Sequence, residues 1–325
     1  MNVVRQTPIV NLATLLLVVA VAFVRHSVAE FPAERIPDIT SALGRGVSAF
    51  QGEHPTIAAW LTAMLLLVAG WFIGQVVKVR DLYFVKTTIT IPLYGIIACG
   101  VFISEDSLLA AIVSLLLVLA MRNYYSSFRN GYSFSPLFFG SMALGIIPLL
   151  YAPSLLLMLL MPLSVIVFKR SAREAFVAIV GLLLPAATIC YITWGMGGEF
   201  LQPVETTLAT ALMTSGYRLF GHLSLGSAMI ICYLLSLVLS AIFFCWINIY
   251  SMGTRARYIT IFNMCAFVLS LSALAAPAGT TTSFGLVAVP AAMMIPAMLV
   301  RLKASAANLL YLILLLLFTL HLFIA

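Results

Sequence analysis

Charged side chains are scarce in this sequence. Asp, Glu, Lys and Arg together make up 8% of the 325 residues, whereas hydrophobic residues make up 63%. Soluble domains carry about 25% charged residues, so the composition excludes an ordinary soluble fold. The net charge of +7 comes from basic residues in short loops beside apolar runs. Such loops select membrane topology and contact anionic lipid headgroups, so no nucleic-acid partner is expected.

Histidine and cysteine are also sparse. The five cysteines lie inside apolar runs with no Cys-x-x-Cys or Cys-His spacing, and they are expected to pack as small hydrophobic side chains. The four histidines show no pair one helical turn apart within a predicted span, which argues against a four-histidine iron site of the kind a carotene monooxygenase would need. We therefore expect no metal and no cofactor. The histidines are His26, His54, His222 and His321.

Eleven apolar stretches fill most of the chain. A helix needs roughly 20 mostly apolar residues to cross a ~30 Å hydrocarbon layer, and it satisfies its own backbone hydrogen bonds there. The sequence therefore predicts an all-α, polytopic transmembrane helical bundle of about 11 spans, forming one domain over residues 1–325. The predicted spans are 9–24, 56–77, 82–103, 107–121, 132–151, 153–168, 175–194, 224–250, 258–276, 283–300 and 304–325.

The basic residues between these spans gather on one side. With the N-terminus inside, 13 of the 17 Lys and Arg residues face the cytoplasm and eight of the ten Asp and Glu residues face outward. Lys and Arg in short loops set orientation. We therefore predict an inside N-terminus, an outside C-terminus and a bacterial inner-membrane location. The first span is expected to remain as an anchor rather than to be cleaved as a signal peptide, because Arg25 and His26 intrude before the small-residue site.

Two outer loops, residues 25–55 and 195–223, carry helix-forming patterns. In each loop, apolar residues recur at helical spacing with polar residues on the opposite face. That pattern is typical of a helix lying in the membrane interface. We predict one amphipathic helix in each loop, on the outer face. The first apolar stripe comprises Ile36, Ile39, Leu43, Val47 and Phe50, and the second comprises Val204, Leu208, Leu212 and Leu219.

The same loops hold the candidate functional side chains. Glu34 and Asp38 would lie near the headgroup plane, where either could act as a general base on a hydroxyl. Arg218 and His222 are one helical turn apart, and an Arg beside a His can hold a phosphate oxyanion. The alternatives are a solvated loop surface for the carboxylates and ordinary lipid contacts for Arg218. Further candidates for phosphate or lipid binding are Arg25, His26 and Arg35.

This arrangement is similar to that of the GT-C membrane glycosyltransferases. Many of those enzymes have a catalytic carboxylate in the first outer loop, an interfacial helix beside it, and basic residues gripping a polyprenyl-phosphate sugar donor. The resemblance is one of arrangement, without a shared motif. It implies Glu34 or Asp38 as the base, and Arg218 with His222 as the groups that stabilise the departing lipid phosphate.

Three sequence segments carry a second resemblance. They are residues 149–153 (Leu-Leu-Tyr-Ala-Pro), 168–174 (Phe-Lys-Arg-Ser-Ala-Arg-Glu) and 181–185 (Gly-Leu-Leu-Leu-Pro). They resemble an uncharacterised family of bacterial inner-membrane proteins, in which an Arg-Glu-aromatic cytoplasmic turn precedes a Gly-Leu-x-x-Pro helix. Here Ala175 follows Glu174 in place of the aromatic residue. The resemblance covers the first 200 residues best and implies only the topology and a bacterial envelope setting.

Three classes of function therefore stay open. A non-catalytic membrane subunit or scaffold in cell-envelope biogenesis fits the lack of motifs, and a transferase using a lipid-linked substrate fits the polar outer loops. A lipid or small-molecule transporter fits the many spans and internal prolines. Yet no charged residue or histidine lies near the middle of a predicted span, and amides such as Asn263 lie toward span ends, which disfavours a proton-driven transporter. The expected partners are membrane lipids, polyprenyl phosphate among them, and other membrane proteins.

Overall fold

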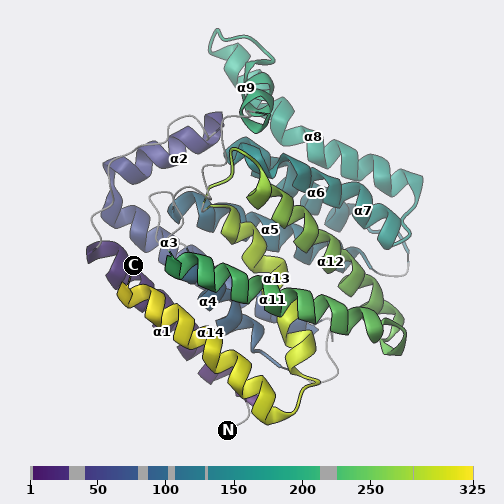
Figure 1. The fold of residues 1–325 in the computed structure, drawn as a ribbon. Coiled ribbons are helices and arrows are strands. Elements are labelled where there is room, and N and C mark those ends of the chain that lie inside the picture. Colours follow the sequence, from purple (N-terminus) through teal and green to yellow (C-terminus); the bar gives the residue numbers. More distant parts are fainter. Residues whose placement is uncertain are drawn as a thin grey trace.

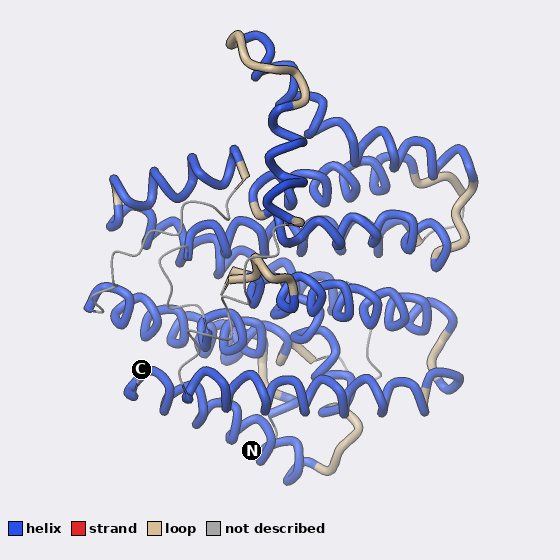
Figure 2. Tube along the Cα trace, turned by 45° about the horizontal axis from the view of Figure 1, so that its top comes forward, coloured by secondary structure: helices blue, strands red, loops and turns tan. Residues whose placement is uncertain are grey.

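The computed structural model describes residues 3–28, 41–79, 87–101, 107–128, 131–212, 225–280 and 282–324. Within these ranges the chain forms thirteen α-helices and three 3-10 helices, with no strand (Figure 1; Figure 2). The predicted all-α class is confirmed. The α-helices are α1 (Pro8–Val28), α2 (Ala42–Glu53), α3 (Pro55–Val79), α4 (Thr90–Val101), α5 (Ser107–Ser127), α6 (Phe134–Leu150), α7 (Leu160–Val167), α8 (Ala172–Gly195), α9 (Gln202–Ala211), α11 (Leu225–Ile247), α12 (Thr254–Ala275), α13 (Ser283–Leu299) and α14 (Ala304–Ile324). The 3-10 helices are η1 (Val3–Arg5), η2 (Ala152–Leu159) and η3 (Ile249–Ser251).

Five of these helices are long and apolar enough to cross a membrane. They are α3, α5, α8, α11 and α12, and their apolar segments run from 20 to 24 residues. Six shorter apolar segments lie in α1, α4, α6, η2 with α7, α13 and α14. These helices mark the chain as a membrane protein by length and composition. The count of eleven spans and the orientation of the termini stay predictions.

The shorter segment formed by η2 and α7 is longer than an α-helix of the same number of residues would be. Residues 152–159 are 3-10 helical and residues 160–167 are α-helical. A 3-10 helix rises about 2.0 Å per residue and an α-helix about 1.5 Å, so the two halves together reach about 28 Å, close to the ~30 Å hydrocarbon thickness. Pro162 lies in the first turn of α7, close to the junction with η2.

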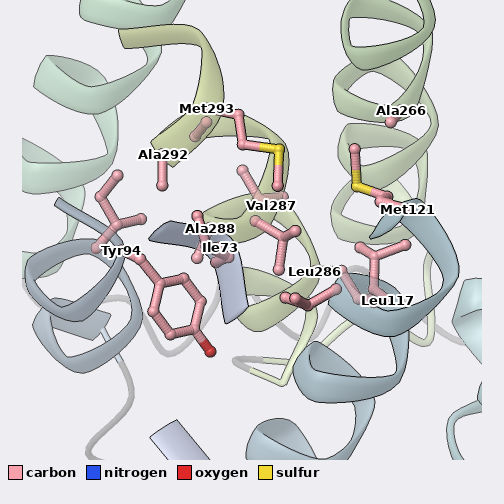
Figure 3. Close-up of a cluster of buried hydrophobic side chains, with 14 of the residues drawn as sticks. Ile73, Tyr94, Leu117, Met121, Ala266, Leu286, Val287, Ala288, Ala292 and Met293 are labelled. Carbon is pink, nitrogen blue, oxygen red and sulfur yellow. The ribbon is translucent and has the colours of Figure 1, made fainter. Parts of the chain in front are cut away.

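Helix α13 occupies the centre of the bundle. All but one of its 17 residues are buried, and it packs against α4, α5, α11 and α12. Figure 3 shows α13 side chains such as Leu286 and Met293 among Ile73, Tyr94 and Met121 from three other helices. Burial on every face explains why this helix is apolar all round. The middle of the bundle is therefore filled by side chains.

Hydrogen bonds between buried polar side chains join several helices inside the bundle. Tyr94 bonds Ser114 at 2.6 Å, and Tyr125 donates to the Oδ1 of Asn263 at 3.3 Å. Such pairing stabilises the bundle, because a polar group left alone in an apolar interior costs several kcal/mol. Asn263 is the tenth residue of α12 and is 1% exposed, so the expectation that it lies toward a span end was wrong. The error arose because α12 begins four residues before the predicted span.

Helices α6 and α8 approach each other through two glycines. A Cβ at Gly145 would lie 2.3 Å from the carbonyl oxygen of Leu182, and one at Gly181 would lie 2.6 Å from that of Phe138. Both partners are backbone atoms, which cannot rotate away as a side chain can. Small residues of this kind let transmembrane helices pack closely.

Helices α2 and α9 lie within the two segments for which the sequence predicted amphipathic helices, and their position in a membrane interface stays a prediction. Ser41 donates to the carbonyl of Leu149, and Gln51 accepts from the backbone N–H of Leu108 at 3.2 Å, so α2 is tied to the end of α6 and the start of α5. Helix α9 contacts α2, α6, α8 and η2. Leu43 and Leu208 of the apolar stripes are exposed, at 39% and 47%. Leu43 and Leu208 therefore point away from the bundle, as lipid-facing side chains of an interfacial helix would, whereas Val47 of the first stripe packs against the core.

Candidate functional site at the basic end

Most of the described cations lie at the end of the bundle opposite α2 and α9. The rings of Phe128 and Phe168 lie 5.9 Å apart, and those of Phe128 and Tyr258 lie 5.8 Å apart. These contacts bring together the end of α5, the end of α7 and the start of α12, toward the right of Figure 1. We call this the basic end. Its described cations include Arg122, Lys169, Arg170, Arg173, Arg255 and Arg257.

The acidic residues that the structure describes are divided between the two ends. Glu53 closes α2, Glu199 precedes α9 and Glu205 lies in its first turn. Glu174, in the first turn of α8, is the one carboxylate at the basic end among the described residues. This division agrees with the predicted charge segregation, although which end faces the cytoplasm stays a prediction.

The candidate residues of the outer loops fall outside what the structure describes. This holds for Glu34, Arg35, Asp38, Arg218 and His222. Two further candidates, Arg25 and His26, belong to the last turns of α1, but their side chains lie outside the described part of the chain. Their proposed catalytic and phosphate-binding roles therefore stay predictions.

The start of α8 is fixed by a reciprocal capping box. The Ser171 hydroxyl accepts from the backbone N–H of Glu174 at 3.4 Å, and the Oε2 of Glu174 accepts from the backbone N–H of Ser171 at 3.0 Å. The Ser171 hydroxyl also donates to the same carboxylate oxygen at 2.9 Å. A capping box satisfies two N–H groups that the first helical turn leaves without partners. Here it also fixes the Glu174 side chain in one position.

The other carboxylate oxygen of Glu174 reaches across to the α5–α6 turn. Its Oε1 accepts from the backbone N–H of Ser133 at 2.8 Å and from the Nη1 of Arg170 at 3.4 Å. The same Nη1 donates to the carbonyl of Gly131 at 3.1 Å. Glu174 is 3% exposed, so this ion pair is buried and hydrogen-bonded, as a buried pair must be. The network locks the start of α8 onto the turn before α6.

A cleft of about 460 Å³ opens beside this network. Its polar part is lined by Lys169, Arg170, Ser171 and Glu174, and its apolar part is lined by aromatic residues. The Tyr132 ring, which is 65% exposed, stacks on Phe134 with centroids 5.2 Å apart. The full lining is Phe128, Gly131, Tyr132, Phe168, Lys169, Arg170, Ser171 and Glu174.

The cleft is suited to binding an anion rather than to acid–base chemistry. Both carboxylate oxygens of Glu174 already accept hydrogen bonds from Ser133, Arg170 or Ser171. The carboxylate is therefore poorly placed to take a proton from a substrate. A metal site needs several ligating side chains, and the described residues contain no group of three or more His, Cys, Asp or Glu residues. Cations beside aromatic rings remain as the chemically useful feature.

Sequence reasoning did not identify this cleft as a site. The Ser-x-x-Glu pattern at 171–174, placed before an apolar run, is a signature of a helix start and would have predicted α8 from residue 172. No comparable signal links Glu174 to Ser133, because the two residues are 41 positions apart.

Comparisons with known proteins identify no relative. No protein-family model, curated protein or solved structure matches this chain. Both resemblances drawn from the sequence therefore stay predictions.

Proposed function

We propose that this chain is a non-catalytic subunit or scaffold of a membrane assembly that builds the cell envelope, located in the bacterial inner membrane. The observation that carries the proposal is the filled centre of the bundle, where α13 is buried on all sides. A scaffold needs a rigid body with fixed surfaces. A carrier needs a central path that opens to both sides in turn, between halves that can move apart.

The packing of α6 against α8 supports a rigid body. Backbone-to-backbone contact at Gly145 and Gly181 leaves no side chain that could rearrange, so the two helices would have to move as a unit. The interhelical bonds of Tyr94 and Tyr125 join α4 to α5 and α5 to α12 in the same way. Specific side-chain hydrogen bonds therefore join the helices of the interior to one another.

Complementation of a deletion strain tests the proposal. The double variant Glu34→Ala/Asp38→Ala removes the carboxylates of the transferase alternative, and Arg218→Ala removes its phosphate ligand. A scaffold predicts that both variants restore growth and the normal membrane proteome when they are present at wild-type levels. Membrane abundance of each variant is the matched control. Loss of complementation by the double variant at normal abundance would favour the transferase and reject the scaffold.

A transport assay separates the remaining class. Purified protein in liposomes, with labelled phospholipid in one leaflet, would show lipid movement only if the bundle opens. A scaffold predicts the same rate as protein-free liposomes. Protein-dependent lipid movement, abolished by heat inactivation, would reject the proposal.

A further inference from the structure

The cleft at the basic end contains a cation that no described carboxylate neutralises. Arg170 is paired with Glu174, and these two charges cancel. The Lys169 ammonium lies 5.6 Å from the centroid of the Tyr258 ring and has no ion-pair partner among the described residues. The lining therefore has one net positive charge, which comes from Lys169. The second cation of the lining, Arg170, is held in place by its bonds to Glu174 and to the carbonyl of Gly131.

The backbone at Lys169 is unusual for a lysine. Its φ is 53°, in the left-handed region that glycine adopts readily and other residues rarely adopt. The N–H of Lys169 donates to the carbonyl of Ile166, and the N–H of Arg170 donates to that of Val165. These two bonds form a Schellman motif at the end of α7, in which glycine is the usual residue at the left-handed position. A lysine at this position is unfavourable for the backbone of the turn, so the turn itself does not explain why a lysine occupies it.

We propose that this cleft binds the phosphate of an anionic membrane-lipid headgroup. Lys169 supplies the charge, Arg170 supplies a fixed guanidinium in the wall, and the rings of Phe128 and Tyr132 supply an apolar surface for the glycerol and upper acyl chains. Basic pockets at the ends of transmembrane helices bind such headgroups. The aromatic part of the lining and the position at the helix ends favour a lipid over free phosphate. The site is independent of the scaffold role.

Native mass spectrometry of the full chain in detergent tests the site. The probes are phosphatidylglycerol, phosphatidylcholine and inorganic phosphate. We expect phosphatidylglycerol to bind most tightly and Lys169→Gln to weaken it by about tenfold, since a charged hydrogen bond contributes roughly 1.5 kcal/mol or more. Lys303→Gln is the matched control, because Lys303 is an exposed cation near the start of α14 and does not line the cleft. It should leave the affinity unchanged.

A second variant separates binding from folding. Lys169→Gly suits the left-handed turn, so its melting temperature should be no lower than that of the wild type, while phosphatidylglycerol binding falls as in Lys169→Gln. Equal binding of phosphatidylglycerol by wild type and Lys169→Gln would overturn the proposal. Equal binding of phosphatidylcholine would show that the cleft does not recognise net charge. If inorganic phosphate at the same concentration displaced phosphatidylglycerol completely, the proposal that a lipid is the ligand would be overturned.

Discussion

Replacing Gly145 with alanine tests the close packing of α6 against α8. The new Cβ would lie 2.3 Å from the carbonyl oxygen of Leu182, whereas ordinary contact begins near 3.4 Å, so the helices would have to part by about 1 Å. Overpacking of this kind costs about 1–3 kcal/mol, and the better helix propensity of alanine returns up to about 1 kcal/mol. We expect a net destabilisation of about 1–2 kcal/mol.

The measurement is the thermal midpoint of the detergent-purified protein, followed by fluorescence size-exclusion. Gly195→Ala is the matched control, because Gly195 ends α8 and its Cβ would meet nothing within 4 Å. That variant should change stability by no more than about 0.5 kcal/mol. The reasoning fails if Gly145→Ala melts at or above the wild-type temperature. Equal losses in both variants would also refute it, since a general effect of alanine would then explain them.

Three further substitutions examine polar contacts. Gln51→Leu removes the acceptor for the Leu108 N–H and the 3.3 Å bond to Ser107. It should therefore destabilise the chain by about 1–2 kcal/mol and speed proteolysis within residues 42–53. Unchanged proteolysis would contradict the docking of α2. Asn263→Leu and Tyr125→Phe, combined in a double-mutant cycle on thermal stability, should show a coupling of about 0.6 kcal/mol, the average for hydrogen bonds between membrane helices. A coupling of zero would show that the pair does not interact.

Several features of the fold could be predicted from the sequence because hydrophobic length and periodicity decide them. Apolar runs predicted the helices, and the apolar stripes predicted α2 and α9. The helix ends were less predictable. The span predicted over residues 107–121 lies in α5, but that helix continues to Ser127. The guanidinium of Arg122 lies 4.9 Å from the centroid of the Phe72 ring, so contact with a neighbouring helix lets the charge remain within α5.

The central position of α13 could not be predicted from its own residues. Its sequence resembles other apolar spans, with two internal prolines, Pro290 and Pro296. A run that is apolar all round can face either lipid or protein, because both environments accept the same side chains. Which spans surround which depends on contacts between residues far apart in the chain. The filled centre is therefore information that only the tertiary structure supplies.

The cleft at the basic end was missed for the same reason, because it too depends on contacts between residues far apart in the chain. The sequence places Lys169, Arg170 and Glu174 together, and an Arg four residues before a Glu looks like an ordinary surface pair worth about 0.5 kcal/mol. The turn before α6 changes that interpretation, because the N–H of Ser133 and the carbonyl of Gly131 bury the pair and engage its polar atoms. Once Arg170 and Glu174 hold two helices together, neither can change partner freely. Lys169 is then the cation of this turn that is available to a ligand.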